Sequence, residues 1–133
     1  MDPVPFAVGS AGAFAVVAAE RASGFGRDRS FYPTVLAVIA VLYVLFGVED
    51  GVPGVIAAET AVAGAFVAVA VVAFRRRSAT LLAAGFAAHG AFDLVHPAVL
   101  PASDAVPTWW TAFCLGVDGP LAVWVLGRWG VAR

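Results

Sequence analysis

The stretch that decides the fold is residues 54–77, GVIAAETAVAGAFVAVAVVAFRRR. Its first 21 residues hold one charged side chain, that of Glu59, and three consecutive arginines follow. An α-helix rises about 1.5 Å per residue, so about 20 apolar residues cross the roughly 30 Å hydrocarbon core of a bilayer. This stretch is therefore typical of a transmembrane helix that ends in a basic loop.

Apolar segments on both sides of this stretch are also close to the length of a membrane span. Short breaks that contain Gly, Pro and charged residues separate them. The five expected spans cover approximately residues 4–19, 31–48, 54–74, 79–100 and 109–127. We predict an all-α, polytopic membrane bundle that forms one domain over residues 1–133. Four spans are the alternative, because the first segment is the shortest.

The composition favours a membrane location and excludes several classes of function. Hydrophobic residues make up 62% of the chain and charged residues 13%, against about half and about a quarter in a soluble domain. The net charge of −1, without a basic stripe, argues against a nucleic-acid partner. Cys114 is the only cysteine, which excludes an intrachain disulfide and a cysteine-based zinc site. Because Asp2 rather than a basic residue follows Met1, we interpret the first segment as a retained span, not a secretory signal.

The basic residues predict the orientation of the spans. All eight are arginines, and they form three groups after the first, third and fifth spans: Arg21, Arg27 and Arg29; Arg75, Arg76 and Arg77; Arg128 and Arg133. The opposite side carries only acidic residues: Asp2, Glu49, Asp50 and Asp104. Cytoplasmic loops of membrane proteins are rich in Lys and Arg. We therefore expect a multi-pass protein of the cell membrane with the N-terminus outside and the C-terminus in the cytoplasm.

Ionisable residues inside the expected spans are the candidate site. In the fourth span His89, Asp93 and His96 follow i, i+4, i+7 spacing, which places them on one face of a helix. The alternating direction of the spans brings Glu59 and Asp118 into the same outer half of the bilayer. Ionisable groups are costly in lipid and tend to be functional there, so we interpret this set as a polar site.

A divalent metal is the most specific chemical interpretation of these residues. Imidazole and carboxylate ligands suit Zn²⁺, Fe and Mn²⁺, and Asp93-x-x-His96 has the spacing by which helical bundles present both ligand types. We assign His89, Asp93 and His96 as metal ligands, although the two histidines lie about 10.5 Å apart along the axis, too far to favour one shared ion. Asp118 or Glu59 would complete a three-ligand site with a position for water. Both are also assigned as catalytic residues, Asp118 as ligand or general base.

Several functions fit this site. The leading hypothesis is a metal-assisted enzyme, such as a hydrolase, that acts on a lipid or another hydrophobic substrate; metal-free acid–base chemistry is a variant. A proton- or cation-coupled transporter or channel component would use the same groups as a relay. A structural membrane subunit would use them only to fix helix packing. So short a chain leaves little room for a private cavity, which favours a homo-oligomer among membrane lipids.

Overall fold

The computed structural model describes residues 1–101 and 103–129. These residues form five α-helices and no strand: α1 (Pro3–Ser23), α2 (Phe31–Asp50), α3 (Pro53–Arg76), α4 (Ala79–Val99) and α5 (Trp110–Trp124). A short 3₁₀-helix, η1 (Phe25–Asp28), follows α1, and a π-helical turn, η2 (Val125–Trp129), extends α5. The prediction of an all-helical chain with five long segments is confirmed. Arg133 of the third arginine group lies outside the described residues.

Local signals in the sequence set where the helices begin and end. The side chain of Asp2 accepts a hydrogen bond from the backbone N–H of Val4 at 3.0 Å, and that of Ser78 accepts one from Leu81 at 3.1 Å. Such N-caps satisfy backbone donors that the first helical turn leaves free. Gly51 ends α2 with φ of 70°, a left-handed conformation that glycine adopts without steric cost.

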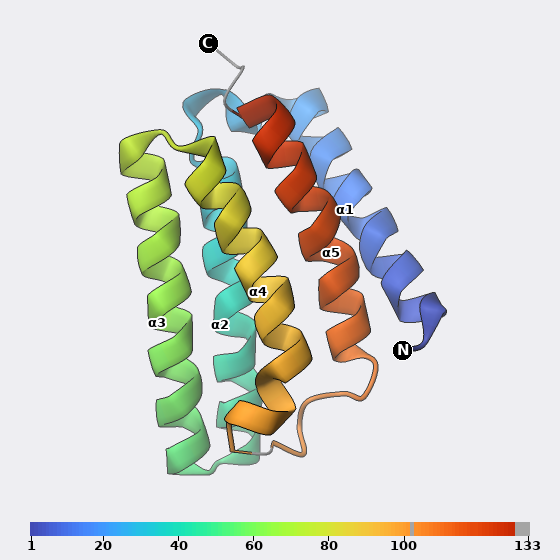
Figure 1. The fold of residues 1–133 in the computed structure, drawn as a ribbon, viewed down its shortest axis with the longest axis vertical. Helices are drawn as coiled ribbons and strands as arrows, with labels where there is room; N and C mark the ends of the chain where they lie inside the picture. The colour runs from blue at the N-terminus through green and yellow to red at the C-terminus, as the bar shows by residue number, and fades with distance from the viewer. Residues whose placement is uncertain (102, 130–133) are drawn as a thin grey trace.

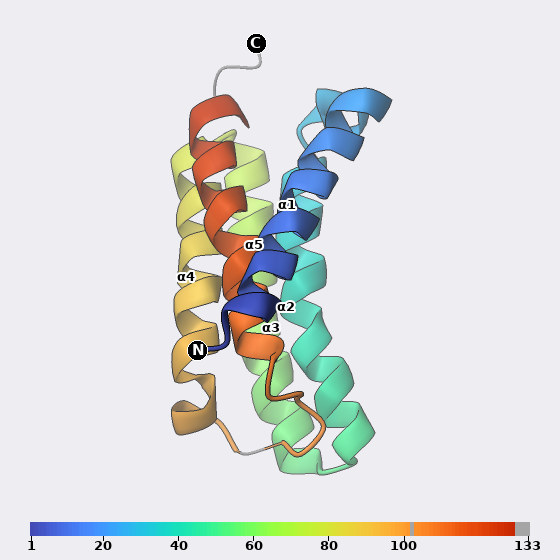
Figure 2. The same cartoon turned by 90° about the vertical axis from the view of Figure 1, so that its right-hand side faces the viewer.

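The helices stand side by side with alternating directions. On the face seen in Figure 1, α4 lies between α3 and α5, and α1 packs against the outer side of α5. Figure 2 shows α1 crossing α5 obliquely. The α1–α2 and α3–α4 connections and the end of η2 meet at the top of Figure 1, which we call the arginine end. The α2–α3 and α4–α5 connections meet at the bottom, which we call the acidic end because Glu49, Asp50 and Asp104 lie there.

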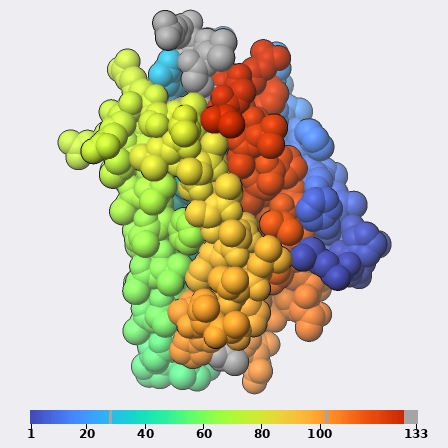
Figure 3. All heavy atoms as spheres, viewed as in Figure 1, coloured from blue at the N-terminus to red at the C-terminus, as the bar shows by residue number. Residues whose placement is uncertain are grey.

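Four helices are long and apolar enough to cross a membrane: α1, α2, α3 and the combined helix of α5 and η2, counted as Trp110–Arg128. At 21 residues α1 is longer than the expected segment 4–19. Although α4 has the same length as α1, it is not among these four helices. It carries polar residues of the candidate site. Its exposed side chains are apolar after Thr80, so its polar groups face inward. In Figure 3 α4 fills the surface between α3 and α5.

Large apolar side chains cover the outside of the bundle. Phe14, Val38 and Val123 are 66%, 56% and 74% exposed, and they lie on three different helices. Soluble monomers rarely expose continuous apolar surface of this extent. The surface is therefore compatible with a multi-pass membrane protein.

The interior divides into an apolar half and a polar half. Toward the arginine end, side chains of all five helices pack into one cluster: Ala13, Tyr32, Leu36, Ala70, Ala73, Leu82, Ala83, Phe86, Leu121 and Val125. Toward the acidic end, a smaller cluster contains Tyr43, Trp110 and Cys114. The buried carboxylate and imidazole side chains of the described chain lie beside this smaller cluster.

The contact between α1 and α5 depends on two glycines. A Cβ atom added to Gly116 would collide with the backbone carbonyl of Phe6, and one added to Gly9 would collide with that of Phe113. Small residues of this kind let helices approach closely in lipid, where packing contacts replace the hydrophobic driving force.

The helix α5 continues through Pro120, although Asp118-Gly119-Pro120 is a sequence at which a helix often breaks. Proline removes one backbone donor, but membrane helices tolerate this loss where neighbouring helices hold the segment. Here α1 and α4 both pack against α5.

Replacing Gly116 with alanine should destabilise the bundle, because the new Cβ would press against the Phe6 carbonyl. Overpacking of this kind costs about 1–3 kcal/mol. Gly119→Ala is the matched control, since it lies on the same helix with no atom within 4 Å of its added Cβ. We expect a lower free energy of unfolding in detergent for G116A than for G119A. Equal stabilities would contradict the glycine contact.

Candidate metal centre

The inward face of α4 carries the three residues that the spacing predicts to lie together. His89, Asp93 and His96 are all buried, and each residue is at most 5% exposed. This face meets α2, α3 and α5, because α4 is packed against all three helices. The remaining members of the site come from α5 and α3.

Asp118 of α5 lies beside two of these residues, His89 and Asp93. The Nδ1 atom of His89 lies 2.8 Å from Oδ2 of Asp118, a hydrogen-bond distance, and 3.5 Å from Oδ2 of Asp93. A Cβ atom on Gly90 would stand only 3.3 Å from the Asp118 Cβ, so a glycine at this position helps the two helices to approach. One ligand atom from each residue lies within 4.8 Å of the other two. We call His89, Asp93 and Asp118 the triad.

Three of the four carboxylate oxygens of the triad have no hydrogen-bond donor at ordinary distance. Within the described residues, no group donates to Oδ1 or Oδ2 of Asp93 or to Oδ1 of Asp118. Buried polar atoms are nearly always hydrogen-bonded, and two carboxylates in an apolar interior are strongly unfavourable unless positive charge neutralises them. The triad therefore favours a bound cation or bound protons.

The triad also has the chemistry of a metal site. One imidazole and two carboxylates suit Zn²⁺, Mn²⁺ or Fe²⁺. Two ligand atoms that each lie about 2.1 Å from a tetrahedral ion are about 3.4 Å from one another. The ligand atoms of the triad all lie within 4.8 Å of one another, so small side-chain rotations would bring them to this separation. Three protein ligands would leave at least one position for water.

His96 belongs to a second group. Its Nε2 atom lies 2.6 Å from Oε1 of Glu59, which is itself buried on α3. We call these two residues the His96–Glu59 pair. The structure thus separates the three residues assigned as ligands: His89 and Asp93 lie with Asp118, and His96 lies with Glu59. The ligand roles of His89, Asp93 and His96 and the catalytic roles of Asp118 and Glu59 stay predictions.

Tyr43 of α2 connects the two groups and was not identified from the sequence. Its ring stacks on that of His96 with centroids 4.2 Å apart, and its centroid is 6.4 Å from that of His89. Its hydroxyl is buried near the Asp93 carboxylate, although no hydrogen bond of ordinary length joins the two groups. The signal was available, because a tyrosine deep inside an expected span needs a polar partner for its hydroxyl.

Thr111 of α5 supports the backbone at Asp93. Proline has no N–H, so Pro97 cannot donate to the carbonyl of Asp93 four residues earlier. The hydroxyl of Thr111 donates to this carbonyl at 3.4 Å instead. The helix accordingly continues past Pro97 to Val99.

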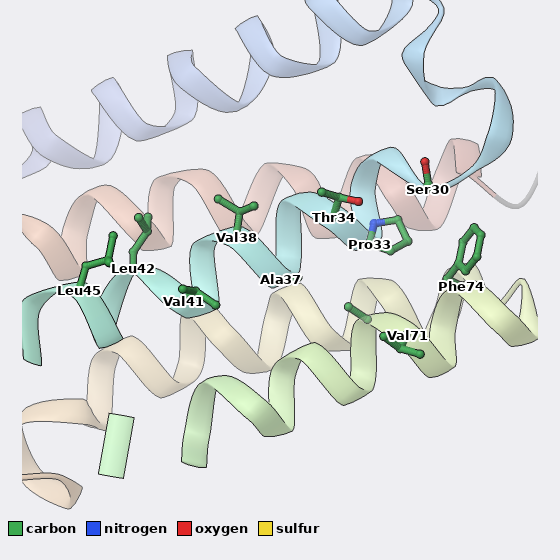
Figure 4. Close-up of a pocket in the computed structure, with 11 residues that line it drawn as sticks. Ser30, Pro33, Thr34, Ala37, Val38, Val41, Leu42, Leu45, Val71 and Phe74 are labelled. Carbon is green, nitrogen blue, oxygen red and sulfur yellow. The ribbon is translucent and has the colours of Figure 1, made fainter. Parts of the chain in front are cut away.

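A cavity of about 220 Å³ at the acidic end reaches His96, and we call it the vestibule. Prolines and hydroxyl side chains make up most of its wall: His96, Pro97, Pro101, Ser103, Val106, Pro107, Thr108 and Thr111. A larger groove of about 530 Å³ lies between α2 and α3, where apolar side chains such as Val38, Val41 and Phe74 line it (Figure 4). None of the site's ionisable residues lines that groove.

The two tryptophans at the start of α5 have different environments. Trp109 is 46% exposed, whereas Trp110 is 9% exposed and packs edge-on against Phe46 with centroids 4.9 Å apart. Trp110 therefore belongs to the interior of the bundle, whereas Trp109 lies at its surface. Trp110 is part of the aromatic wall around Tyr43.

No protein-family model, curated protein or solved structure matches the chain. The described residues define a helical protein with long apolar helices and a buried His/Asp cluster that could hold a metal ion.

Replacing Thr111 with valine should destabilise the protein by about 1 kcal/mol, because the Asp93 carbonyl loses its donor. In a Pro97→Ala background the same change should cost less, since alanine restores a backbone N–H. The free energies of unfolding of the wild type, T111V, P97A and the double variant give the coupling free energy between Thr111 and Pro97 directly. An equal cost of T111V in both backgrounds would show that the hydroxyl does not replace the missing donor.

Proposed function

We propose that this chain is a multi-pass membrane protein that holds a divalent metal ion at the triad, and that it is a metal-assisted enzyme acting on a lipid or another hydrophobic substrate. The observation that carries the proposal is the set of buried carboxylate oxygens of Asp93 and Asp118 that lack donors beside His89. A divalent cation would satisfy all three side chains at once.

The charge distribution supports the proposed orientation. The described arginines of the connections and of η2 lie at one end of the bundle, and Glu49, Asp50 and Asp104 lie at the other. The positive-inside rule places the arginine end in the cytoplasm. The vestibule then opens at the outer face, and the triad lies near the middle of the bilayer.

A metal accounts for the triad better than a network that only fixes helix packing. A packing network is stable when each buried donor and acceptor finds a partner inside the protein. Here the His89–Asp118 contact uses one carboxylate oxygen, and the other oxygens of both carboxylates have no donor at ordinary hydrogen-bond distance, although the Tyr43 hydroxyl lies near Asp93. These remaining oxygens are what a cation would bind.

The one-sided position of the polar groups favours an enzyme over a transporter. Among the described residues, the buried charged or imidazole side chains lie between the middle of the bundle and the acidic end: Glu59, His89, Asp93, His96 and Asp118. The arginine half is filled by wholly buried side chains such as Leu36, Phe86 and Leu121. A path for ions or protons needs polar groups or water across the whole membrane, and this apolar half opposes one.

The chemistry of such a site is that of metal-bound water. A divalent ion makes bound water nucleophilic near neutral pH and polarises an ester, amide or phosphoester oxygen. In this scheme Asp118 binds the metal rather than acting as a free base. Glu59 is the candidate general base, because its partner His96 lines the vestibule from which a substrate would approach.

The protein purified without chelator should contain about one Zn, Mn or Fe atom per chain. Asp93→Asn and Asp118→Asn keep the size of each side chain but remove its charge, so both should lose most of the metal. Glu49→Gln, at an exposed acidic residue at the end of α2, is the matched control and should keep it. Elemental analysis of the four folded proteins decides the question: absence of metal in the wild type, or equal metal in all four, would overturn the metal site.

The enzyme and transporter hypotheses are separated in liposomes of phosphatidylcholine and phosphatidylglycerol. We expect the metal-loaded wild type to cleave an ester or phosphoester reporter lipid, D118N to cleave none, and neither protein to release a proton or divalent-ion gradient. Gradient release by the wild type but not by D118N, without turnover, would favour the transporter instead.

A further inference from the structure

We infer that the vestibule is the access route of the metal ion, and that the His96–Glu59 pair is a transient binding station and gate on this route. The inference rests on the proposed metal at the triad. It adds a second cation-binding position and explains how an ion reaches a fully enclosed site.

The triad is sealed in the folded bundle. His89, Asp93 and Asp118 are each at most 1% exposed, so a hydrated ion cannot reach them without a path through the protein. The apolar cluster closes the side toward the arginine end. The groove between α2 and α3 and a second apolar groove between α1 and α5 contain none of the ionisable residues, whereas the vestibule reaches His96.

Ligand atoms continue inward from the floor of the vestibule. Along α4, Asp93 lies about 4.5 Å deeper than His96, and His89 lies about 6 Å deeper than Asp93. Both oxygens of Asp93 lack donors from the described chain, and so does Oε2 of Glu59. An ion moving inward would thus be bound first by the His96–Glu59 pair, then by Asp93 and finally by the whole triad, without crossing an apolar gap.

In this proposal the pair closes the path. The short contact between His96 Nε2 and Glu59 Oε1 joins α4 to α3 where His96 lines the vestibule. The Tyr43 ring lies against His96 at an interplanar angle of 25°, which restricts rotation of the imidazole. For an ion to pass, this hydrogen bond must open, and both side chains then become its ligands. Metal uptake and release should therefore share one barrier.

Stopped-flow binding of Co²⁺ to the detergent-solubilised protein tests the gate. Glu59→Gln removes the charge of the station but keeps its size, and Thr108→Leu narrows the mouth of the vestibule. Each variant should lower the rates of uptake and release by the same factor, about tenfold, and leave Kd unchanged. Thr34→Leu, in the apolar groove of Figure 4, is the matched control and should change neither rate.

The outcomes separate this inference from the proposed function. If Co²⁺ binds the wild type and both variants keep wild-type rates, the access route is wrong and the metal site stands. If E59Q raises Kd through faster release alone, Glu59 is a ligand of the resting site and the gate is also wrong. If the wild type binds no Co²⁺, the proposed metal site fails and the inference fails with it.

Discussion

The contact between His89 of α4 and Asp118 of α5 is the interaction on which the arrangement of the bundle depends. It places an imidazole and a carboxylate 2.8 Å apart in an interior that water does not reach. Such groups are tolerated at membrane depth only when they are enclosed by protein and compensated by opposite charge. The polar face of α4 therefore has to be covered by α2, α3 and α5, and α4 becomes the helix around which these three are packed. The outer face of α4 stays apolar for the same reason.

This requirement divides the bundle by depth. Toward the arginine end the side chains form a continuous apolar core, and toward the acidic end they form an aromatic wall around the ionisable groups. The apolar half gives the bundle a rigid base and closes the site on that side. The polar half is supported by side chains that replace lost backbone contacts, as Thr111 does for Asp93 beside Pro97. The fold thus combines a buried His/Asp cluster with a cavity that reaches His96 from the acidic end.

Much of this architecture could be predicted from the sequence, because long apolar segments and groups of arginines can be recognised without knowing how the helices pack. The five helices and the common face of His89, Asp93 and His96 follow from such signals. The pairing of these residues does not, because it depends on the rotation and crossing of neighbouring helices. Helical spacing alone could not decide that Asp118 meets His89 while Glu59 meets His96. The continuous helix at Pro120 and the burial of Trp110 depend on neighbouring helices in the same way.

The most direct test of the metal site is X-ray absorption spectroscopy of the Zn²⁺-loaded protein. The structure predicts a shell of nitrogen and oxygen ligands at about 2.0–2.2 Å with the signature of one imidazole, and no sulfur at about 2.3 Å. Asp118→Asn should weaken or abolish this shell while the helices stay folded. Two imidazoles in the resting shell, a sulfur from Cys114, or a spectrum of fully hydrated Zn²⁺ would each contradict a site formed by His89, Asp93 and Asp118.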